Sequence, residues 1–454
     1  MTEVNSNFLS KYKDEFLKDL ADLIEIQSYL KETDSYPNVK AIKDVLSLFS
    51  DIALRFGLRT HINDEGYFGY AEYGSEDLPE MVGILGHLDI VDAGDRNTWN
   101  TDPYKLVIDG DKLIGRGTSD DKGPTLVGLY LLRYLKDNNI VLDRRVRVIV
   151  ATDEEVLWRG INKYLESQEK PVVAFTPDSS FPMYYAEKGL LQLQIKGGKS
   201  IIEAKLGMAF NSVPDKVEYE GPHSQEIVDE LISNQVQFME DGEKIVVFGE
   251  AKHAKNADKG DNAIFKFLKG MKNTDSENQM VQFLINEVKL DPRAINIFGR
   301  VQDIDTGVQT FNLGKLDLNK DECVASIDMR LPVTTMDKDE VMEILTKSAD
   351  KYGLKVEEYD FLPKVYHERD GKLVTELMKI YQHHTGDMKS EPVATGGATY
   401  ARAIPNCIAY GPSSPFGETT EHLPNEYALY SSLEKSFDIY LDAVKLLTEK
   451  GGVI

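Results

Sequence analysis

Apolar residues recur at helical spacing in the first part of the chain. Residues 8–30 carry leucines and aromatic side chains three and four positions apart, and residues 40–57 repeat this pattern. Two amphipathic helices are predicted there. Short continuous apolar runs then occur at 81–85, 146–151 and 172–175. With a helical stretch at 124–136 between the first two runs, this arrangement is typical of buried, mainly parallel strands in an α/β domain.

The pattern changes after Gly189. Segments such as 191–195 and 322–328 alternate apolar and polar residues, which predicts half-exposed antiparallel strands. Helical spacing returns near residue 368, and a closing helix is predicted from about 427 to 449. The middle of the chain is therefore expected to form a separate α+β region.

Chain length also indicates two domains. A single hydrophobic core stops growing near ~250 to 300 residues, whereas this chain has 454 residues. We predict an α/β domain with helices on both faces of a mainly parallel sheet, formed by residues 1–187 and 368–454. An inserted α+β domain is expected at residues 188–367.

Composition narrows the classes of function. The chain has 76 acidic and 52 basic residues, a formal net charge of −24, which repels nucleic-acid phosphates and anionic lipids. Its two cysteines, Cys323 and Cys407, are too few and too distant for a disulfide framework or a cysteine zinc cluster. The first residues lack a basic and an apolar targeting region, and no apolar run approaches ~18 residues. We expect a cytoplasmic enzyme that acts on small molecules, with any metal held by histidine and carboxylates.

Each apolar run of the predicted α/β domain leads directly into side chains that can bind a metal. In chain order these side chains are His87, Asp89, Glu154, Glu155 and Asp178. Ligands bind outside the carboxyl ends of strands in open α/β sheets, so all five are expected at one rim. Asp120, in a glycine-containing loop before a helix, can reach the same rim.

The convergence of these groups is what indicates a metal site. A single carboxylate at a strand end or helix start is more often a cap or a surface charge. Several carboxylates at one rim repel each other strongly unless a bound cation compensates them. Oxygen and imidazole ligands without a thiolate suit Zn²⁺, Mn²⁺ or Co²⁺.

The eight histidines have different contexts. His87 ends a predicted buried strand, and His422 lies between a loop and the last helix, within reach of the rim. His253 belongs to the inserted domain, where a surface role is equally plausible. His383 and His384 close a predicted helix, where interaction with the helix C-terminus is expected. The other three, His61, His223 and His367, are expected at the surface.

The ordered motifs resemble those of a known family. They are Gly-His-Leu-Asp-Ile-Val at 86–91, Gly-Arg-Gly at 115–117, Asp-Asp-Lys-Gly-Pro at 120–124, Thr-Asp-Glu-Glu at 152–155, Pro-Asp at 177–178 and Glu-Lys-Gly at 187–189. In this order they resemble the M20 metallopeptidases, and within them the bacterial dipeptidases of the PepV type, which are of the Xaa-His or β-alanyl dipeptidase kind. The resemblance covers nearly the whole chain.

The resemblance implies two metal ions and assigns ligands to each of them. His87 and Asp178 would bind one metal, Glu155 and His422 would bind the other, and Asp120 would bridge both.

It also implies roles for the neighbours of these ligands. Asp89 would orient His87, and Glu154 would be the general base that takes a proton from the bridging water. The peptide bond between Asp120 and Asp121 is expected to be cis.

The inserted domain resembles the family's lid. The residues at positions where the lid or a glycine-rich loop meets the substrate are Asn211, His253 with Asn262, Arg330, Gly397 and Arg402. Arg330 suits the C-terminal carboxylate of a substrate because its planar fork donates two parallel hydrogen bonds. The sequence departs from the family at 255–259, where members more often show a Pro-Glu pair, so fewer matching positions support His253.

The expected function is hydrolysis of dipeptides with a free C-terminus by a water molecule that two metal ions activate. Zn²⁺ is the expected metal, with Mn²⁺ or Co²⁺ as the alternatives. The alternative is an N-acyl-amino-acid deacylase of the same family, of the desuccinylase or deacetylase type, whose metal centre is similar. The inserted span of about 180 residues favours the dipeptidase. A binding protein without activity is disfavoured because the ligands and Glu154 are all present. A monomer is favoured, with a homodimer as the alternative.

Overall fold

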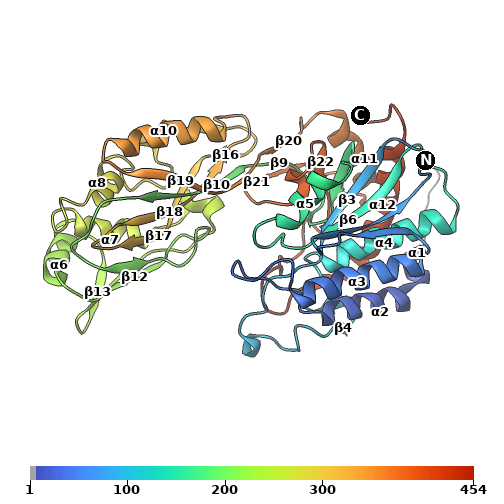
Figure 1. Cartoon of the computed structure of the whole chain (residues 1–454), viewed down its shortest axis with the longest axis horizontal. Helices are drawn as coiled ribbons and strands as arrows, with labels where there is room; N and C mark the ends of the chain where they lie inside the picture. Colours follow the sequence, from blue (N-terminus) through green and yellow to red (C-terminus); the bar gives the residue numbers. More distant parts are fainter. Residues whose placement is uncertain (1–6, 454) are drawn as a thin grey trace. The chain divides into compact units, whose positions relative to one another are not determined.

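The computed structural model describes residues 7–453 and divides into two compact units (Figure 1). Unit 1 contains the described residues up to Tyr185, together with His367–Val393 and those from Thr399 onward. Unit 2 contains Ala186–Tyr366 and the short segment Ala394–Ala398. Among residues 7–453, none of the helices combines the length and apolarity that crossing a membrane requires.

Four parallel strands form the centre of the sheet in unit 1. Their order is β6 (Arg145–Ala151), β3 (Met81–His87), β7 (Val173–Thr176) and β22 (Cys407–Ala409). Every residue of these four strands is buried. This agrees with the continuous apolar runs, because a strand covered on both faces has no need to alternate.

The strands that flank this parallel centre are antiparallel. β1 (Arg59–Ile62) and β2 (Phe68–Tyr73) form a hairpin, and β2 also pairs with β6. On the other side, β22 pairs with the first residue of β9 (Tyr184–Glu187), which continues into unit 2 and pairs there with β20 (Val365–Tyr366). The predicted α/β fold is confirmed, with its parallel part confined to the middle of the sheet.

Helices cover both faces of this sheet. On one face, α4 (Lys122–Asp137) packs against β3 and β6 and against α12 (Tyr430–Thr448). On the other face lies α5 (Arg159–Ser167), whose Tyr164 contacts the side chain of Arg147 in β6. The next residue of β6, Val148, faces α4, and successive side chains of a strand point to opposite faces of the sheet. α2 (Lys13–Glu25) packs on α4 and on α3 (Lys40–Arg55) (Figure 1).

The first predicted helix is shorter than its apolar pattern. Residues 8–30 form α1 (Phe8–Lys11) and then α2, which ends at Glu25 because Ile26 has extended backbone angles. The buried ammonium of Lys122 donates to the carbonyl oxygens of Leu23 and Ile26 at 2.9 and 2.8 Å. These bonds satisfy carbonyl groups that a helix end leaves unpaired.

The main sheet of unit 2 is antiparallel. Its order is β11 (Ala204–Leu206), β17 (Thr310–Leu318), β18 (Val324–Leu331), β10 (Gly189–Lys196) and β19 (Lys355–Leu362). In β10 the side chains of Leu191, Leu193 and Ile195 are fully buried while the glutamines between them are not. The alternation predicted for 191–195 is therefore present, whereas the half-exposed strand predicted at 322–328 is wrong, because every residue of β18 after Val324 is buried.

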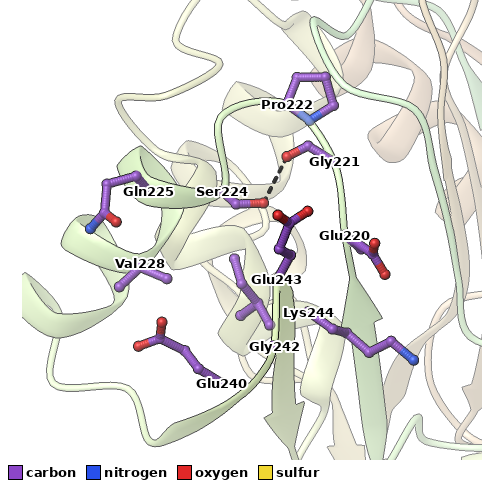
Figure 2. Close-up of a pocket in the computed structure, with 11 residues that line it drawn as sticks. Glu220, Gly221, Pro222, Ser224, Gln225, Val228, Glu240, Gly242, Glu243 and Lys244 are labelled. Carbon is purple, nitrogen blue, oxygen red and sulfur yellow. Dashed lines mark hydrogen bonds between the residues drawn. The ribbon is translucent and has the colours of Figure 1, made fainter.

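A second sheet of unit 2 carries an acidic pocket. β12 (Lys216–Tyr219), β14 (Lys244–Phe248) and β13 (Phe238–Asp241) form this sheet next to α6 (Ser224–Ser233). A pocket of about 700 Å³ is lined by Glu220, Glu240 and Glu243 among others (Figure 2). These carboxylates are exposed. Water solvates these carboxylates, so no bound cation is needed to offset their repulsion. The metal site predicted in unit 1 rests on such a need.

The remaining elements connect these sheets and cores. In unit 1 they are η1 (Arg96–Thr98), β4 (Val107–Asp109), β5 (Lys112–Ile114), β8 (Ser179–Ser180), α11 (Lys372–Thr385), η3 (Tyr400–Arg402), β23 (Pro412–Ser413) and β24 (Tyr427–Leu429). In unit 2 they are η2 (Ala254–Lys259), α7 (Ala263–Met271), α8 (Gln279–Asn286), α9 (Ile295–Phe298), β15 (Gln302–Asp303), β16 (Gly307–Val308) and α10 (Lys338–Asp350). β21 (Val393–Thr395) contains the point where the chain passes from unit 1 to the short segment of unit 2.

A buried ion-pair network lies in the unit 1 sheet, centred on Glu72 of β2. Its carboxylate is 2.6 Å from Arg147 and 3.2 Å from Arg145, and it also accepts from Arg59 at 2.9 Å. Burial raises the pKa of Glu72, but the three arginines outweigh this and hold it below its usual value. Removing one partner of such a network leaves buried charges without compensation.

We predict that Glu72→Ala lowers the free energy of unfolding of unit 1 by about 3 to 5 kcal/mol, because Arg147 then stays buried without its carboxylate and Arg145 keeps only Glu169 as a partner. Trp99 and Trp158, the two tryptophans of the chain, are both buried in unit 1. Their fluorescence during urea unfolding therefore follows this unit. The control is Asp44→Ala, which breaks an exposed pair with Lys40 on α3 and should cost about 0.5 kcal/mol or less. Equal losses in the two variants would refute the prediction.

Candidate metal centre

The carboxyl ends of three parallel strands bring the predicted ligands together. His87 is the last residue of β3 and pairs with Ala151 of β6, so 152–155 follow immediately beside it. Ile84 of β3 pairs with Phe175 of β7. His87 and Asp178 each lie three residues beyond that pair, which explains why they reach the same rim.

The His87 ring is oriented by a backbone carbonyl. Its Nδ1 lies 3.1 Å from the carbonyl oxygen of Asp89, and since a carbonyl only accepts, Nδ1 carries a proton and donates. Nε2 points the other way, 2.9 Å from Asp120 Oδ1 and 3.8 Å from Asp178 Oδ2. Nε2 is therefore the atom of this ring that faces the carboxylates and is placed to bind a metal.

Asp120 lies between two imidazoles. Its Oδ1 contacts Nε2 of His87, and its Oδ2 contacts Nε2 of His422 at 2.9 Å. His422 Nε2 is also 3.0 Å from Glu155 Oε1. One carboxylate thus presents a separate oxygen to each of two imidazole nitrogens.

The charges at this rim are out of balance. Burial raises the pKa of Glu154 and of Asp178 well above the ordinary value. Neighbouring carboxylates raise it further, whereas the charge of His87 lowers it by less than burial raises it. Burial also raises the pKa of Glu155, with Asp120 adding to it. Cations at this rim would relieve the repulsion among these groups.

The two imidazoles have the opposite shift. Burial favours their neutral form, but hydrogen bonds to carboxylates outweigh it and raise the pKa of His422 to about 11 and that of His87 well above its usual value. Asp120 pairs with both rings, and these bonds overcome burial and hold its pKa far below its ordinary range. These hydrogen bonds therefore favour the protonated, positively charged form of both rings.

Two overlapping groups of donor atoms could each hold an ion. In one, atoms of His87, Glu154 and Asp178 all lie within 4.8 Å of one another, and in the other those of His87, Asp120 and Glu155 do. The donor set is carboxylate oxygen and imidazole nitrogen, which fits Zn²⁺, Mn²⁺ or Co²⁺. Glu154, the expected general base, is itself among the donor atoms of the first group.

Further buried carboxylates support the ligands. Asp89 Oδ2 accepts from the backbone N–H of Glu155 at 3.1 Å, and its Oδ1 is 3.6 Å from His87 Nδ1. Asp121 Oδ2 accepts from the N–H of His87 at 3.1 Å and from the Thr125 hydroxyl at 2.8 Å. A side chain at Gly86 would collide with that hydroxyl, since its Cβ would lie 1.9 Å away.

Backbone geometry at two ligand positions is unusual. The peptide bond between Asp120 and Asp121 is cis, as the resemblance implied. His422 has φ of 64°, in the left-handed region that residues other than glycine enter rarely.

The residues expected to meet substrate from unit 2 have varied surroundings. His253 is exposed, and its Nδ1 accepts from the N–H of Lys255 at 3.1 Å, so the proton of the neutral ring lies on Nε2. Asn211 is exposed at the neighbouring turn. Asn262 is buried as the N-cap of α7, where its side chain accepts from two backbone N–H groups and donates to the Leu313 carbonyl.

Arg330 is buried and makes bonds within unit 2. Its Nε and Nη2 donate to the two oxygens of Asp328 at 2.7 and 2.9 Å, and its Nη1 donates to the Gly396 carbonyl at 2.9 Å. These bonds use three of the five guanidinium N–H groups. The N–H of Gly397 donates to the Thr395 hydroxyl at 3.0 Å in the same segment.

The other predicted positions lie in unit 1. Arg402 is buried in η3. His384 is 2.9 Å from Asp442 of α12, so it pairs with a carboxylate of the next helix. The expectation that His367 is a surface residue is wrong, because it is half-buried and its ring donates to the Cys407 carbonyl at 2.7 Å. Burial lowers the pKa of His367.

Sequence reasoning gave no role to several residues that support this centre. Asp121, Arg116 and Glu426 are all buried next to the ligand loops. Their motifs were visible, since Arg116 stands between two glycines and Glu426 follows His422 by four positions. What the sequence alone did not show is that these two side chains meet.

Comparison with known proteins gives one family. Residues 83–446 match the model of peptidase family M20/M25/M40. The chain is 30% identical to the Bacillus subtilis (strain 168) protein named "Putative dipeptidase YtjP", over 95% of this chain and 97% of that protein. It is 29% identical to a Staphylococcus aureus (strain MW2) protein of the same description, over 96% and 97% of the two chains.

Solved structures share the fold at low identity. Human carnosine dipeptidase 1 aligns with a TM-score of 0.61 and 14% identity, over 98% of this chain and 99% of that one. Aminoacylhistidine dipeptidase from Vibrio alginolyticus aligns with a TM-score of 0.56 and 13% identity, over 95% and 96%. With a family match over most of its length, this chain belongs to peptidase family M20/M25/M40.

Proposed function

We propose that this protein is a metal-dependent dipeptidase that hydrolyses the peptide bond of dipeptides with a free C-terminus. Membership of the peptidase family and the relatives named as dipeptidases support peptide-bond hydrolysis. The observation that carries the two-metal part of the proposal is Asp120, whose two carboxylate oxygens each contact a different imidazole.

The proposed ligands form two sets that share Asp120. His87 and Asp178 hold one cation, and Glu155 and His422 hold the other. Zn²⁺ is the proposed metal, with Mn²⁺ and Co²⁺ as alternatives that the same donor atoms accept. When bound, such cations lower the pKa of water toward ~7 and so supply hydroxide near neutral pH.

Glu154 is the proposed general base. Its carboxylate accepts a proton from the attacking water and then donates it to the departing amine of the substrate. Burial and neighbouring carboxylates raise the pKa of Glu154, which favours its holding a proton between the two steps. Asp89 supports this arrangement by fixing the backbone of Glu155 and the neighbourhood of His87.

Residues of unit 2 are proposed to bind the substrate. His253 carries its proton on Nε2, so this atom can donate to the oxyanion that forms on the peptide carbonyl. Arg330 has N–H groups beyond those bound to Asp328 and Gly396, and they would donate to the substrate carboxylate. Asn211 and Gly397, with Arg402 of unit 1, complete the proposed contacts.

We also propose that the protein is cytoplasmic and monomeric. Its two cysteines are free thiols buried in the fold, which suits a reducing compartment. Sedimentation at several protein concentrations tests the monomer, with a homodimer as the outcome that would replace it.

The substrate class is tested with a panel of compounds. We expect hydrolysis of dipeptides, including β-alanyl ones, and at least ~10²-fold lower kcat/KM for the same dipeptides with an amidated C-terminus, because the carboxylate contact is lost. N-acetyl and N-succinyl amino acids serve as the comparison. Faster cleavage of these acyl amino acids than of any dipeptide would show a deacylase instead.

Two neighbouring glutamates should differ in their effect on metal content. Glu154→Gln should keep both metal equivalents and lower kcat by about 10² to 10⁴, since proton transfer is lost. Glu155→Gln, the matched control, should lose one equivalent. Elemental analysis of the dialysed proteins together with kcat makes the measurement. Near-normal kcat in a fully loaded Glu154→Gln protein would rule out the general base.

Metal binding should displace protons. With the pKa of His422 near 11 in the metal-free protein, the ring is protonated at pH 7 and must lose its proton to bind. Zinc affinity should therefore rise with pH, by about tenfold per pH unit for each proton displaced. Calorimetry in buffers of different ionisation enthalpy counts these protons. His422→Ala should displace one fewer, and binding without proton release at pH 7 would contradict the prediction.

A further inference from the structure

A buried ion pair joins the loop that carries Asp120 to the segment that carries His422. Arg116 and Glu426 are 1% and 0% exposed, and Arg116 Nη1 donates to Glu426 Oε2 at 2.7 Å. The guanidinium also lies over the ring of Trp99, 5.2 Å from its centroid. Both charges are fully withdrawn from water, so each depends on the other for compensation.

The second oxygen of Glu426 binds backbone. Oε1 accepts from the N–H groups of Gly117 and Ser119 at 3.0 Å and of Asp120 at 3.2 Å. The carbonyl oxygen of Glu426 in turn accepts from the N–H of Gly115 at 3.0 Å. The carboxylate therefore holds the backbone of residues 117–120 up to the residue that bears the proposed bridging ligand.

The same residue fixes the segment after His422. Glu426 is followed by β24, whose Tyr427 pairs with Ile114 of β5, directly before the Asp120 loop. The residue before Glu426, Asn425, accepts from the N–H of Asn100 at 2.7 Å and donates to the Thr98 carbonyl at 3.2 Å. His422 thus begins a short segment whose other end is tied to the loop of Asp120.

We propose that Glu426 is a positioning residue that sets the separation of Asp120 and His422 and so completes the metal position that His422 belongs to. This inference rests on the proposed two-metal function. The converging groups are three N–H donors on one side and a guanidinium on the other. A carboxylate satisfies both sides at once because it offers two acceptor oxygens and no donor.

Substitution of Glu426 by glutamine distinguishes its hydrogen bonds to the backbone from its ion pair with Arg116. In Glu426→Gln the amide oxygen can still accept from the three backbone N–H groups, but the amide nitrogen then faces Arg116 and the ion pair is lost. Residues that orient metal ligands from behind typically contribute 10- to 100-fold to metal affinity. Glu426→Gln should therefore weaken one metal equivalent and leave the fold in place.

A purely structural role would look different. Glu72 is matched to Glu426, since it is also buried in unit 1 and paired with buried arginines. It lies in strand β2 of the sheet, and its ion pairs within residues 7–453 are with Arg59, Arg145 and Arg147, outside the ligand loops. Glu72→Gln therefore controls for the general cost of removing a buried carboxylate. His422→Ala identifies which metal equivalent depends on His422.

The test is a zinc titration of the four metal-free proteins, wild type, Glu426→Gln, Glu72→Gln and His422→Ala, against a competing chelator. We expect Glu426→Gln to weaken, by about 10- to 100-fold, the same equivalent that His422→Ala removes. Glu72→Gln should bind both equivalents within about threefold of wild type, although its tryptophan fluorescence shows a lower unfolding midpoint.

Two outcomes would overturn the proposal. One is wild-type affinity for both equivalents in folded Glu426→Gln protein, and the other is the same weakening in Glu72→Gln. The Co²⁺ absorption spectrum gives a second readout, because a displaced ligand changes it in Glu426→Gln but not in Glu72→Gln. Failure of the proposed function is distinguishable, since a wild-type protein that binds two metals and cleaves no dipeptide leaves the role of Glu426 standing.

Discussion

Repulsion among crowded, partly buried carboxylates is the constraint on which this structure depends. Asp120, Glu154, Glu155 and Asp178 converge at the ends of parallel strands, where burial raises the pKa of the last three. The pKa values of His87 and His422 are raised, which favours the positive form of the imidazoles that offsets part of this charge. The rest of unit 1 holds these groups together despite their repulsion, through the parallel register of β3, β6 and β7 and the supporting bonds of Asp89 and Asp121. The fold itself therefore creates the excess of negative charge that favours cation binding at this site.

Much of the fold could be predicted from the sequence because its signals are local. The apolar runs that became β3, β6 and β7 are continuous since both faces of these strands are covered, and the alternation in β10 reflects one covered face. The antiparallel flanks of the unit 1 sheet were not predicted. Strand direction depends on which strands pair, and the pairing of β2 with β6 joins positions more than seventy residues apart.

The convergence of His87, Glu155 and Asp178 could also be predicted, since each follows a buried strand in a recognisable motif. The bonds that support them could not. Arg116 meets Glu426 across 310 positions of sequence, and nothing in either motif specifies the other. Similarly, the sequence led to the expectation that the Arg330 guanidinium binds a substrate carboxylate. It did not show that Asp328, two residues away on the same strand, accepts two hydrogen bonds from this guanidinium. Contacts between distant segments, and competition among neighbouring donors and acceptors, are decided by packing.

The short segment Ala394–Ala398 has a consequence for how this architecture can be recombined. It belongs to unit 2 although the chain on both sides of it belongs to unit 1. Within unit 2 it supplies the Thr395 carbonyl that accepts from the N–H of Lys188 and the Gly396 carbonyl that accepts from Arg330. Exchange of residues 186–366 between two relatives as one continuous gene fragment would therefore leave the graft with five residues of the recipient. Inheritance of an intact unit requires two separate pieces of the gene to travel together.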